Sequence, residues 1–159
     1  MKVTIAAVGR LKAGPERELV ERYFARVTKA GRALGLDFVL REFSESNAAR
    51  PADRQAAEAT TLSAAIPAGA AIIALDERGK GIGSADFAAL IARLRDGGRR
   101  ETVLLIGGPD GLDPSLRQRA EAVVSFGPMT LPHQLVRALV AEQLYRATTI
   151  LSGHPYHRA

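Results

Sequence analysis

The sequence predicts an α/β protein with a mostly parallel sheet and helices on both faces. Short apolar, β-branched segments alternate with amphipathic segments of helix length, and such alternation places a helical crossover between parallel strands. The 159 residues are 47% hydrophobic but only 5% aromatic, which indicates a largely aliphatic core. Without repeats or a linker-like boundary, residues 1–159 are expected to form a single domain.

The first half of the chain predicts two strands, each followed by a helix. Apolar β-branched residues form both strand segments. The first helix has Pro15 and acidic residues in its first turn and ends at Gly35. The second opens at Pro51 and stops before Pro67. The expected elements are strands at 2–9 and 36–43 and helices at 14–35 and 51–66.

The second half predicts three strands and three helices. Residues 77–84 are expected to form a charged, glycine-rich loop, with Ser84 capping the helix that follows. Asp113 and Pro114 suit the start of a short helix, and Pro132 suits the start of the last long one. The expected elements are strands at 70–76, 102–108 and from 123, and helices at 84–95, 114–121 and 132–151.

Composition limits the partners and the compartment. The net charge of +5 and the pI of about 10.1 favour an anionic partner such as RNA, DNA or lipid, although many basic proteins bind none. The absence of cysteine excludes disulfides, thiolate catalysis and cysteine-based zinc sites. The apolar run at residues 3–8 is too short for a signal peptide, and no apolar stretch approaches the ~20 residues that span a bilayer. We therefore expect a cytoplasmic protein with no membrane partner.

Three loops are candidates for a ligand site. Ligands of parallel α/β sheets bind beyond the carboxyl ends of the strands, which selects the loops after Asp76, Ile106 and Phe126. Residues 107–111, GGPDG, match neither a dinucleotide nor a phosphate-binding fingerprint. They either let a ligand approach the backbone, so that a side chain at Gly107 would occupy ligand space, or only form a tight turn. Residues 127–132 suit an apolar pocket wall for an adenine ring.

The last thirty residues hold all three histidines, His133, His154 and His157. The chain ends in HPYHRA, whose arginine suits phosphate and whose tyrosine and histidines suit stacking on bases. Such a tail is either disordered or held in place for a function, and its composition favours the second. The tail histidines have no carboxylate beside them in the sequence, so no metal site is expected. A Ser/His/Asp hydrolase is excluded because no G-x-S-x-G segment is present.

The last helix has polar groups on opposite sides and apolar residues between them. His133 and Arg137 share one face, and Glu142 and Arg146 share a nearly opposite one. A helix that is apolar over most of its surface is usually buried on more than one side, which predicts packing against its own sheet and against a second subunit. For Glu142 and Arg146, a simple helix ion pair is the alternative.

Three segments carry a resemblance to a known family. These are LLIGGPDGL at 104–112, SFGPMTLPHQLVRALVAEQLYRA at 125–147 and HPYHR at 154–158. In these segments the chain resembles the RlmH family of SPOUT-class methyltransferases. The resemblance implies a homodimer with a C-terminal trefoil knot, which the rarity of knots would otherwise argue against. It also implies methylation of N3 of a pseudouridine in 23S ribosomal RNA by S-adenosylmethionine, without a metal.

The resemblance also implies a set of site residues. The tail would lie over the cofactor pocket. Histidine is the natural proton acceptor near neutral pH, so His133 or His157 would be the base, and Arg146 or Arg158 would stabilise the deprotonated ring. Tyr156 would help to form the RNA site. The residues expected to bind the cofactor are Leu75, Gly107, Gly108, Phe126, Gly127, Pro128, Met129, Thr130 and Leu131.

Two other classes of function remain open from the sequence. One is a non-catalytic RNA-binding module that uses the same basic face. The other is a flavodoxin-like nucleotide or phosphate binder, on fold class alone. Binding of S-adenosylmethionine would separate the methyltransferase from both. The sequence does not say whether the substrate is the assembled ribosome, nor which basic residues dock the RNA, for which Arg10 and Lys12 are candidates.

Overall fold

The computed structural model describes residues 1–158, and its elements follow the predicted order. The strands are β1 (Lys2–Val8), β2 (Asp37–Phe43), β3 (Ala71–Gly81), β4 (Glu101–Ile106) and β5 (Ala122–Ser125). The helices are α1 (Pro15–Gly31), α2 (Pro51–Ala65), α3 (Ser84–Asp96), α4 (Pro114–Arg119) and α5 (His133–Leu151), and a short 3-10 turn, η1 (Arg32–Leu34), follows α1.

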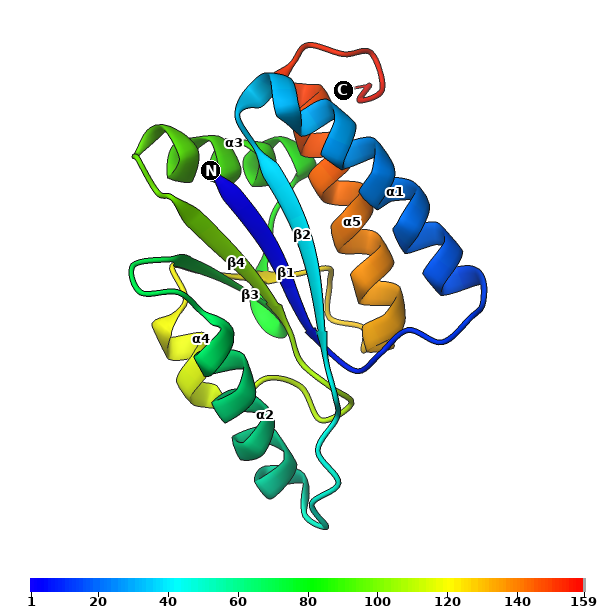
Figure 1. Cartoon of the computed structure of the whole chain (residues 1–159), viewed down its shortest axis with the longest axis vertical. Coiled ribbons are helices and arrows are strands. Elements are labelled where there is room, and N and C mark those ends of the chain that lie inside the picture. The colour runs from blue at the N-terminus through cyan, green and yellow to red at the C-terminus, as the bar shows by residue number, and fades with distance from the viewer. Residues whose placement is uncertain (159) are drawn as a thin grey trace.

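The strands form one parallel sheet in the order β2-β1-β4-β3-β5. Helices α1, α3 and α5 cover one face, and α2 and α4 cover the other (Figure 1). Alternate side chains of β1 supply both cores: Val3 and Ile5 pack on the α1/α3/α5 side, and Ala6 and Val8 on the α2/α4 side. The predicted fold class is confirmed. Strand order does not report how the chain threads, so the trefoil knot stays a prediction.

Two predictions around residues 77–84 are wrong. The segment is not simply a loop, because β3 continues to Gly81 and pairs again with β5 after an irregularity between Leu75 and Lys80. Cross-strand pairing with β5 overrides the polar, glycine-rich local sequence. Ser84 does not cap α3: Gly83 is the cap residue, and the Ser84 hydroxyl donates to Gln143 Oε1 on α5 at 2.8 Å.

The other helix ends follow the predicted signals. The Asp113 side chain accepts from the Ser115 backbone N–H at 2.8 Å and caps α4. Gly35 takes a left-handed conformation with φ of 67° where the segment after α1 ends. Within residues 1–158, none of the helices combines the length and apolarity that crossing a membrane requires.

The carboxyl ends of β3, β4 and β5 meet at one edge of the sheet because all three strands are parallel. α5 begins at this edge and runs back along the sheet against α1 and α3 (Figure 1). The loops that the sheet rule selects therefore lie beside the first turn of α5.

Candidate functional site

A cavity of about 630 Å³ opens at the carboxyl edge of the sheet, between the three selected loops and the start of α5. All of the predicted cofactor residues line it except Pro128, which is exposed and outside the lining. The residues that line it as predicted are Leu75, Gly107, Gly108, Phe126, Gly127, Met129, Thr130 and Leu131.

The glycine loop 107–111 is held from outside the cavity by α2. Arg54 makes two hydrogen bonds to the Asp110 carboxylate, at 2.6 and 3.0 Å, and Gln55 donates to the Asp110 carbonyl. The bonded guanidinium of Arg54 lowers the pKa of Asp110. The sequence missed Arg54, because the two partners lie 56 residues apart.

Side chains at Gly107 and Gly108 would meet other atoms of the protein. A Cβ on Gly107 would lie 2.6 Å from the carbonyl carbon of Gly111, and one on Gly108 would lie 2.9 Å from Glu58 Oε2. The expectation that a side chain at Gly107 would occupy ligand space is therefore wrong. It would instead force open the turn that closes on Gly111.

The opposite wall is the segment 125–132. The Ser125 hydroxyl donates to the Gly127 carbonyl and accepts from the Gly127 N–H, which shapes a turn in which Gly127 has a φ of 122°. Thr130 donates to Glu77 across the cavity mouth at 3.3 Å. Asp76 is nearly buried and paired with Arg117 at 3.1 Å, so its charge is compensated.

His133 lies in the lining where α5 begins. Burial lowers the pKa of His133, while Glu45, 3.6 Å from its Nε2, opposes the shift. The imidazole is therefore predominantly neutral at pH 7 and able to accept a proton. A Cβ on Gly9 would lie 2.9 Å from both Glu45 Oε1 and His133 Nε2, so β1 ends directly against this pair.

One turn further along α5, Arg137 is fully buried. Its guanidinium pairs with Glu42 and donates to the Val8 carbonyl at 3.0 Å. Glu42 also accepts from the Leu11 backbone N–H at 3.0 Å. Arg137 thus joins α5 to β2 and to the chain that leaves β1. One signal of this role is present in the sequence, because Arg137 stands in an otherwise apolar stretch of helix.

The other end of α5 carries the tail. Glu142 pairs with Arg146 and accepts from the Tyr156 hydroxyl at 3.1 Å. The Tyr156 ring lies against Tyr145, with 4.8 Å between centroids, and beneath the Arg146 guanidinium. His157 Nδ1 is 3.4 Å from Arg146 Nη1. Burial, a hydrogen bond with Tyr23 and the charge of Glu142 raise the pKa of Tyr156. The tail is therefore held in place, as its composition indicated. The Glu142–Arg146 pair is not only an ion pair within the helix, because both of its members also contact the tail.

The two ends of α5 are far apart. Arg146 follows His133 by 13 positions in one helix, which corresponds to a separation of about 20 Å. Figure 1 shows the tail beyond the end of α5 that is opposite to its start. Within one chain, Tyr156, His157, Arg158 and Arg146 therefore do not reach the cavity, whereas His133 does.

Comparison with known proteins identifies the family. A family profile described as "Predicted SPOUT methyltransferase" matches residues 1–157. The chain belongs to the SPOUT methyltransferase family. It is 57% identical to the "Ribosomal RNA large subunit methyltransferase H" of Brucella anthropi and 56% identical to that of Mesorhizobium japonicum, each over 100% of both chains.

Two solved structures share the fold of this chain at much lower identity. A probable methyltransferase from Bordetella pertussis Tohama I is 16% identical, with a TM-score of 0.52 over 92% of this chain and 95% of that one. A probable methylase family protein from Haemophilus influenzae Rd KW20 is 9% identical, with a TM-score of 0.50 over 99% of this chain and 70% of that one.

This SPOUT chain exposes apolar side chains near its cavity. Leu135 and Leu139 on α5 are 41% and 40% exposed, and Met129 and Phe126 in the neighbouring loop are 78% and 39% exposed. Large apolar side chains gathered on one region of a surface usually mark an interface.

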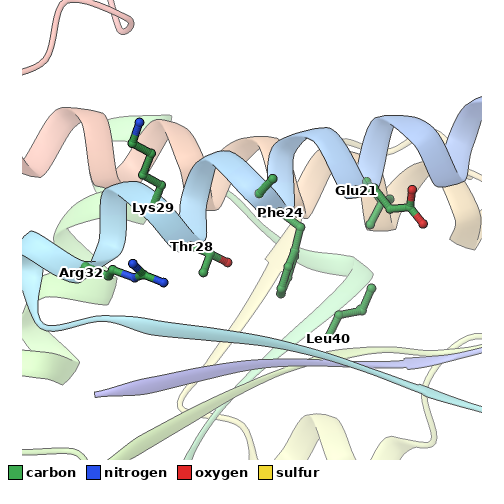
Figure 2. A pocket seen from close by; sticks show the side chains of 8 residues that line it. Glu21, Phe24, Thr28, Lys29, Arg32 and Leu40 are labelled. Atoms are coloured by element: carbon green, nitrogen blue, oxygen red, sulfur yellow. The ribbon is translucent and has the colours of Figure 1, made fainter.

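A second hollow of about 590 Å³ lies between α1 and β2. In Figure 2, Phe24 reaches from α1 towards the strand that carries Leu40, and the Lys29 ammonium points away from the hollow. Its lining contains one carboxylate, Glu21, and no histidine or glycine loop. The hollow thus has neither the histidine nor the main-chain loops that line the first cavity.

Proposed function

We propose that this chain transfers a methyl group from S-adenosylmethionine to N3 of a pseudouridine in 23S ribosomal RNA. The proposal places residues 1–159 as one domain acting on ribosomes in the cytoplasm. The observation that carries it is the cavity: two of the segments that resemble the RlmH family converge on its walls. The full-length relatives at 57% and 56% identity, whose name specifies the large ribosomal subunit RNA, support the substrate.

The cavity residues fit S-adenosylmethionine. The volume of about 630 Å³ lies in the range of small-molecule sites. Leu75, Leu131 and Val136 supply apolar wall for an adenine ring, and the loops 107–111 and 126–132 supply main-chain donors and acceptors. Glu77 also lines the cavity, and its carboxylate would attract the positively charged sulfur of the cofactor.

The bound cofactor supplies a methyl group on a positively charged sulfur. As the N3–carbon bond forms and the sulfur–carbon bond breaks, the N3 proton must be accepted by the protein or by solvent. His133 is the candidate acceptor, because it lines the cavity and burial keeps it neutral. Arg158, exposed in the tail, is the candidate cation for the deprotonated ring. Arg146 is already paired with Glu142.

The separation within α5 supports a site shared between two subunits of a homodimer. The tail groups are on the order of 20 Å from the cavity of their own chain. A twofold contact through the exposed faces of Leu135 and Leu139 would bring the partner's tail to this cavity. Each cavity would then take His133 from one chain and Tyr156, His157 and Arg158 from the other.

Substitutions on adjacent residues of α5 test the dimer. Leu139→Asp changes a residue that is 40% exposed, and it should yield folded monomers without methyl transfer. Val140 is 1% exposed in the core of its own chain, so Val140→Asp should unfold the protein and does not test the interface. Light scattering with circular dichroism separates the outcomes, and a folded, dimeric Leu139→Asp variant would refute this interface.

Complementation tests the shared site. One variant lacks residues 156–159 and keeps its cavity. The other is Gly127→Val, which forces a β-branched residue to a φ of 122° in the cavity loop and keeps its tail. Each alone should be inactive, and mixing them with subunit exchange should restore activity, because some heterodimers contain one complete site. If mixing restores nothing although heterodimers form, the site lies within one chain.

A methyl-transfer assay tests the function itself. Labelled S-adenosylmethionine is offered with large-subunit RNA that lacks the modification, as naked RNA, as free subunits and as whole ribosomes. Digestion to nucleosides should yield 3-methylpseudouridine from at least one substrate. Binding of S-adenosylmethionine with methylation of a different nucleoside would correct the target. No binding of S-adenosylmethionine would instead favour the non-catalytic RNA-binding module.

A further inference from the structure

The segment that follows β1 places two cations at the edge of the sheet where the cavity opens. Arg10 and Lys12 are exposed, and they flank Leu11, which is buried against Val20 and Ala138. Gly9, the residue before Arg10, lies against the Glu45–His133 pair. Figure 1 shows the chain between β1 and α1 passing beside the start of α5.

This segment is fixed by the fold. The Gly9 N–H donates to the Phe43 carbonyl at 2.8 Å, and the Leu11 N–H donates to Glu42 at 3.0 Å. The Arg137 guanidinium donates to both Glu42 and the Val8 carbonyl. A backbone held at residues 8, 9 and 11 presents the exposed side chains beside them from a defined position, so a polyanion that docks there loses little affinity to ordering the loop.

The charges of Arg10 and Lys12 have no ion-pair partner in the described part of the chain. Among the described residues 1–158, no carboxylate lies within ion-pairing distance of either side chain. The nearby carboxylates have other partners, since Glu42 pairs with Arg137 and Glu45 faces His133. Two uncompensated cations beside a cavity suit a chain of phosphates that enters it.

We propose that Arg10 and Lys12 bind backbone phosphates of the RNA substrate and guide the strand past His133 into the cavity. The inference rests on the proposed function and adds the entry path of the RNA, which the site residues alone do not define. Phosphate contacts position a nucleic acid without reading its sequence. The target base would be selected inside the cavity, and the segment 9–12 would set the direction of approach.

The test compares Arg10→Gln/Lys12→Gln with Arg93→Gln/Arg100→Gln, which removes the same charge from exposed arginines at the opposite edge of the sheet. The intact homodimers are assayed for methyl transfer to unmethylated ribosomal substrate and, without S-adenosylmethionine, for RNA binding at several salt concentrations. Each lost phosphate contact should lower the salt slope by about 0.7. The Arg10/Lys12 variant should therefore bind about tenfold more weakly near physiological salt, with a slope shallower by about 1.4.

Three results separate the explanations. A raised KM for RNA with S-adenosylmethionine affinity unchanged, and a control pair within about twofold of wild type, supports the proposal. Equal losses of RNA affinity in the Arg10/Lys12 and Arg93/Arg100 variants would show an effect of net charge alone. A fall in kcat without any change in KM or salt slope would assign the segment to the chemical step. Either result overturns the proposal. If wild type transfers no methyl group, the proposed function fails, but the salt slopes still test the contacts.

Discussion

The two ends of α5 place functional groups by different means. At the start of α5, His133 faces Glu45 in the segment after β2. One turn later, the buried Arg137 pairs with Glu42 on β2 and donates to the Val8 carbonyl of β1, and both partners lie far away in the sequence. At the last turns, Glu142 and Arg146 hold Tyr156 and His157 through contacts that span at most 14 residues. The first end is part of the core, and the second is a group of surface contacts, most of them between residues that are close in the sequence.

The contrast predicts different responses to mutation. Groups fixed by the core cannot be removed without loss of stability, because their partners remain buried and unpaired. Groups held by a local contact on the surface can be removed with little effect on folding, so their loss shows in function. We therefore expect the tail to affect the rate of methyl transfer and Arg137 with its partners to affect the free energy of unfolding.

The largest effect is expected from deletion of residues 156–159. The Tyr156 contacts lie on the surface of α1 and α5, so the melting temperature should fall by only a few degrees. Methyl transfer should fall by about 100-fold or more, because the groups that position the base are lost. Activity within about threefold of wild type would remove the tail from the site. Gln118→Ala, an exposed change on α4, is the control for general effects of mutation.

Next comes the buried pair. Glu42→Ala leaves the fully buried Arg137 guanidinium without its carboxylate and should lower the free energy of unfolding by about 3–5 kcal/mol. Arg137→Met should cost less, because Glu42 is partly exposed and can be hydrated. Urea unfolding of both variants checks the order. Equal losses would show that Arg137 matters through the Val8 carbonyl rather than through its charge.

The sequence predicts the cavity better than it predicts the two ends of α5. Parallel strands put their carboxyl ends at one edge whatever the side chains, so the loops after Asp76, Ile106 and Phe126 could be selected from the order of elements. The Glu42–Arg137 pair joins residues 95 positions apart, and nothing in the local sequence specifies that partner.

The separation of Arg146 from His133 was available in the sequence, because a continuous helix from residue 132 to residue 151 has a fixed rise per residue. The position of the tail beyond residue 151 was not, because it depends on the contacts of Tyr156 and His157 with Glu142 and Arg146. Gly107 likewise could not be interpreted without coordinates, because its contact is with the backbone of Gly111 after the turn has closed. Glycine in a loop gives the same local signal for either role.

A smaller effect is expected from Arg54→Ala, which frees the glycine loop from α2. The fold should persist, and the affinity for S-adenosylmethionine should fall by about three- to tenfold, because the loop must be ordered when the cofactor binds. Asp110 has a lowered pKa, so the Arg54 contact is formed at all pH values above the usual Asp range and is lost only in acid. Calorimetry should therefore find the same ratio of wild-type to Arg54→Ala affinity for S-adenosylmethionine at pH 6 and pH 8. A ratio that changes between these values would point to another group.

The smallest effect concerns the pH dependence at the core end of α5. Burial and Arg137 lower the pKa of His133, while Glu45 and Glu58 raise it. Glu45→Gln removes one raising charge, so the pKa of His133 should fall further. If His133 accepts the proton, the acid limb of the rate profile should move to lower pH, and at pH 8 the rates should agree within about twofold. The Glu45 side chain is 46% exposed, and solvent screening keeps this shift small.

Stability should follow the same sign. The folded state favours neutral His133, so its contribution to stability is present above the pKa of the unfolded chain and is lost as the pH falls through the lower folded value. Glu45→Gln lowers only the folded value, so this loss should begin at the same pH and extend to lower pH. His157→Gln, at the surface end, should lower the rate without moving the acid limb. An acid limb that is lost in His157→Gln but does not shift in Glu45→Gln would give the proton to the tail and leave His133 to orient the RNA.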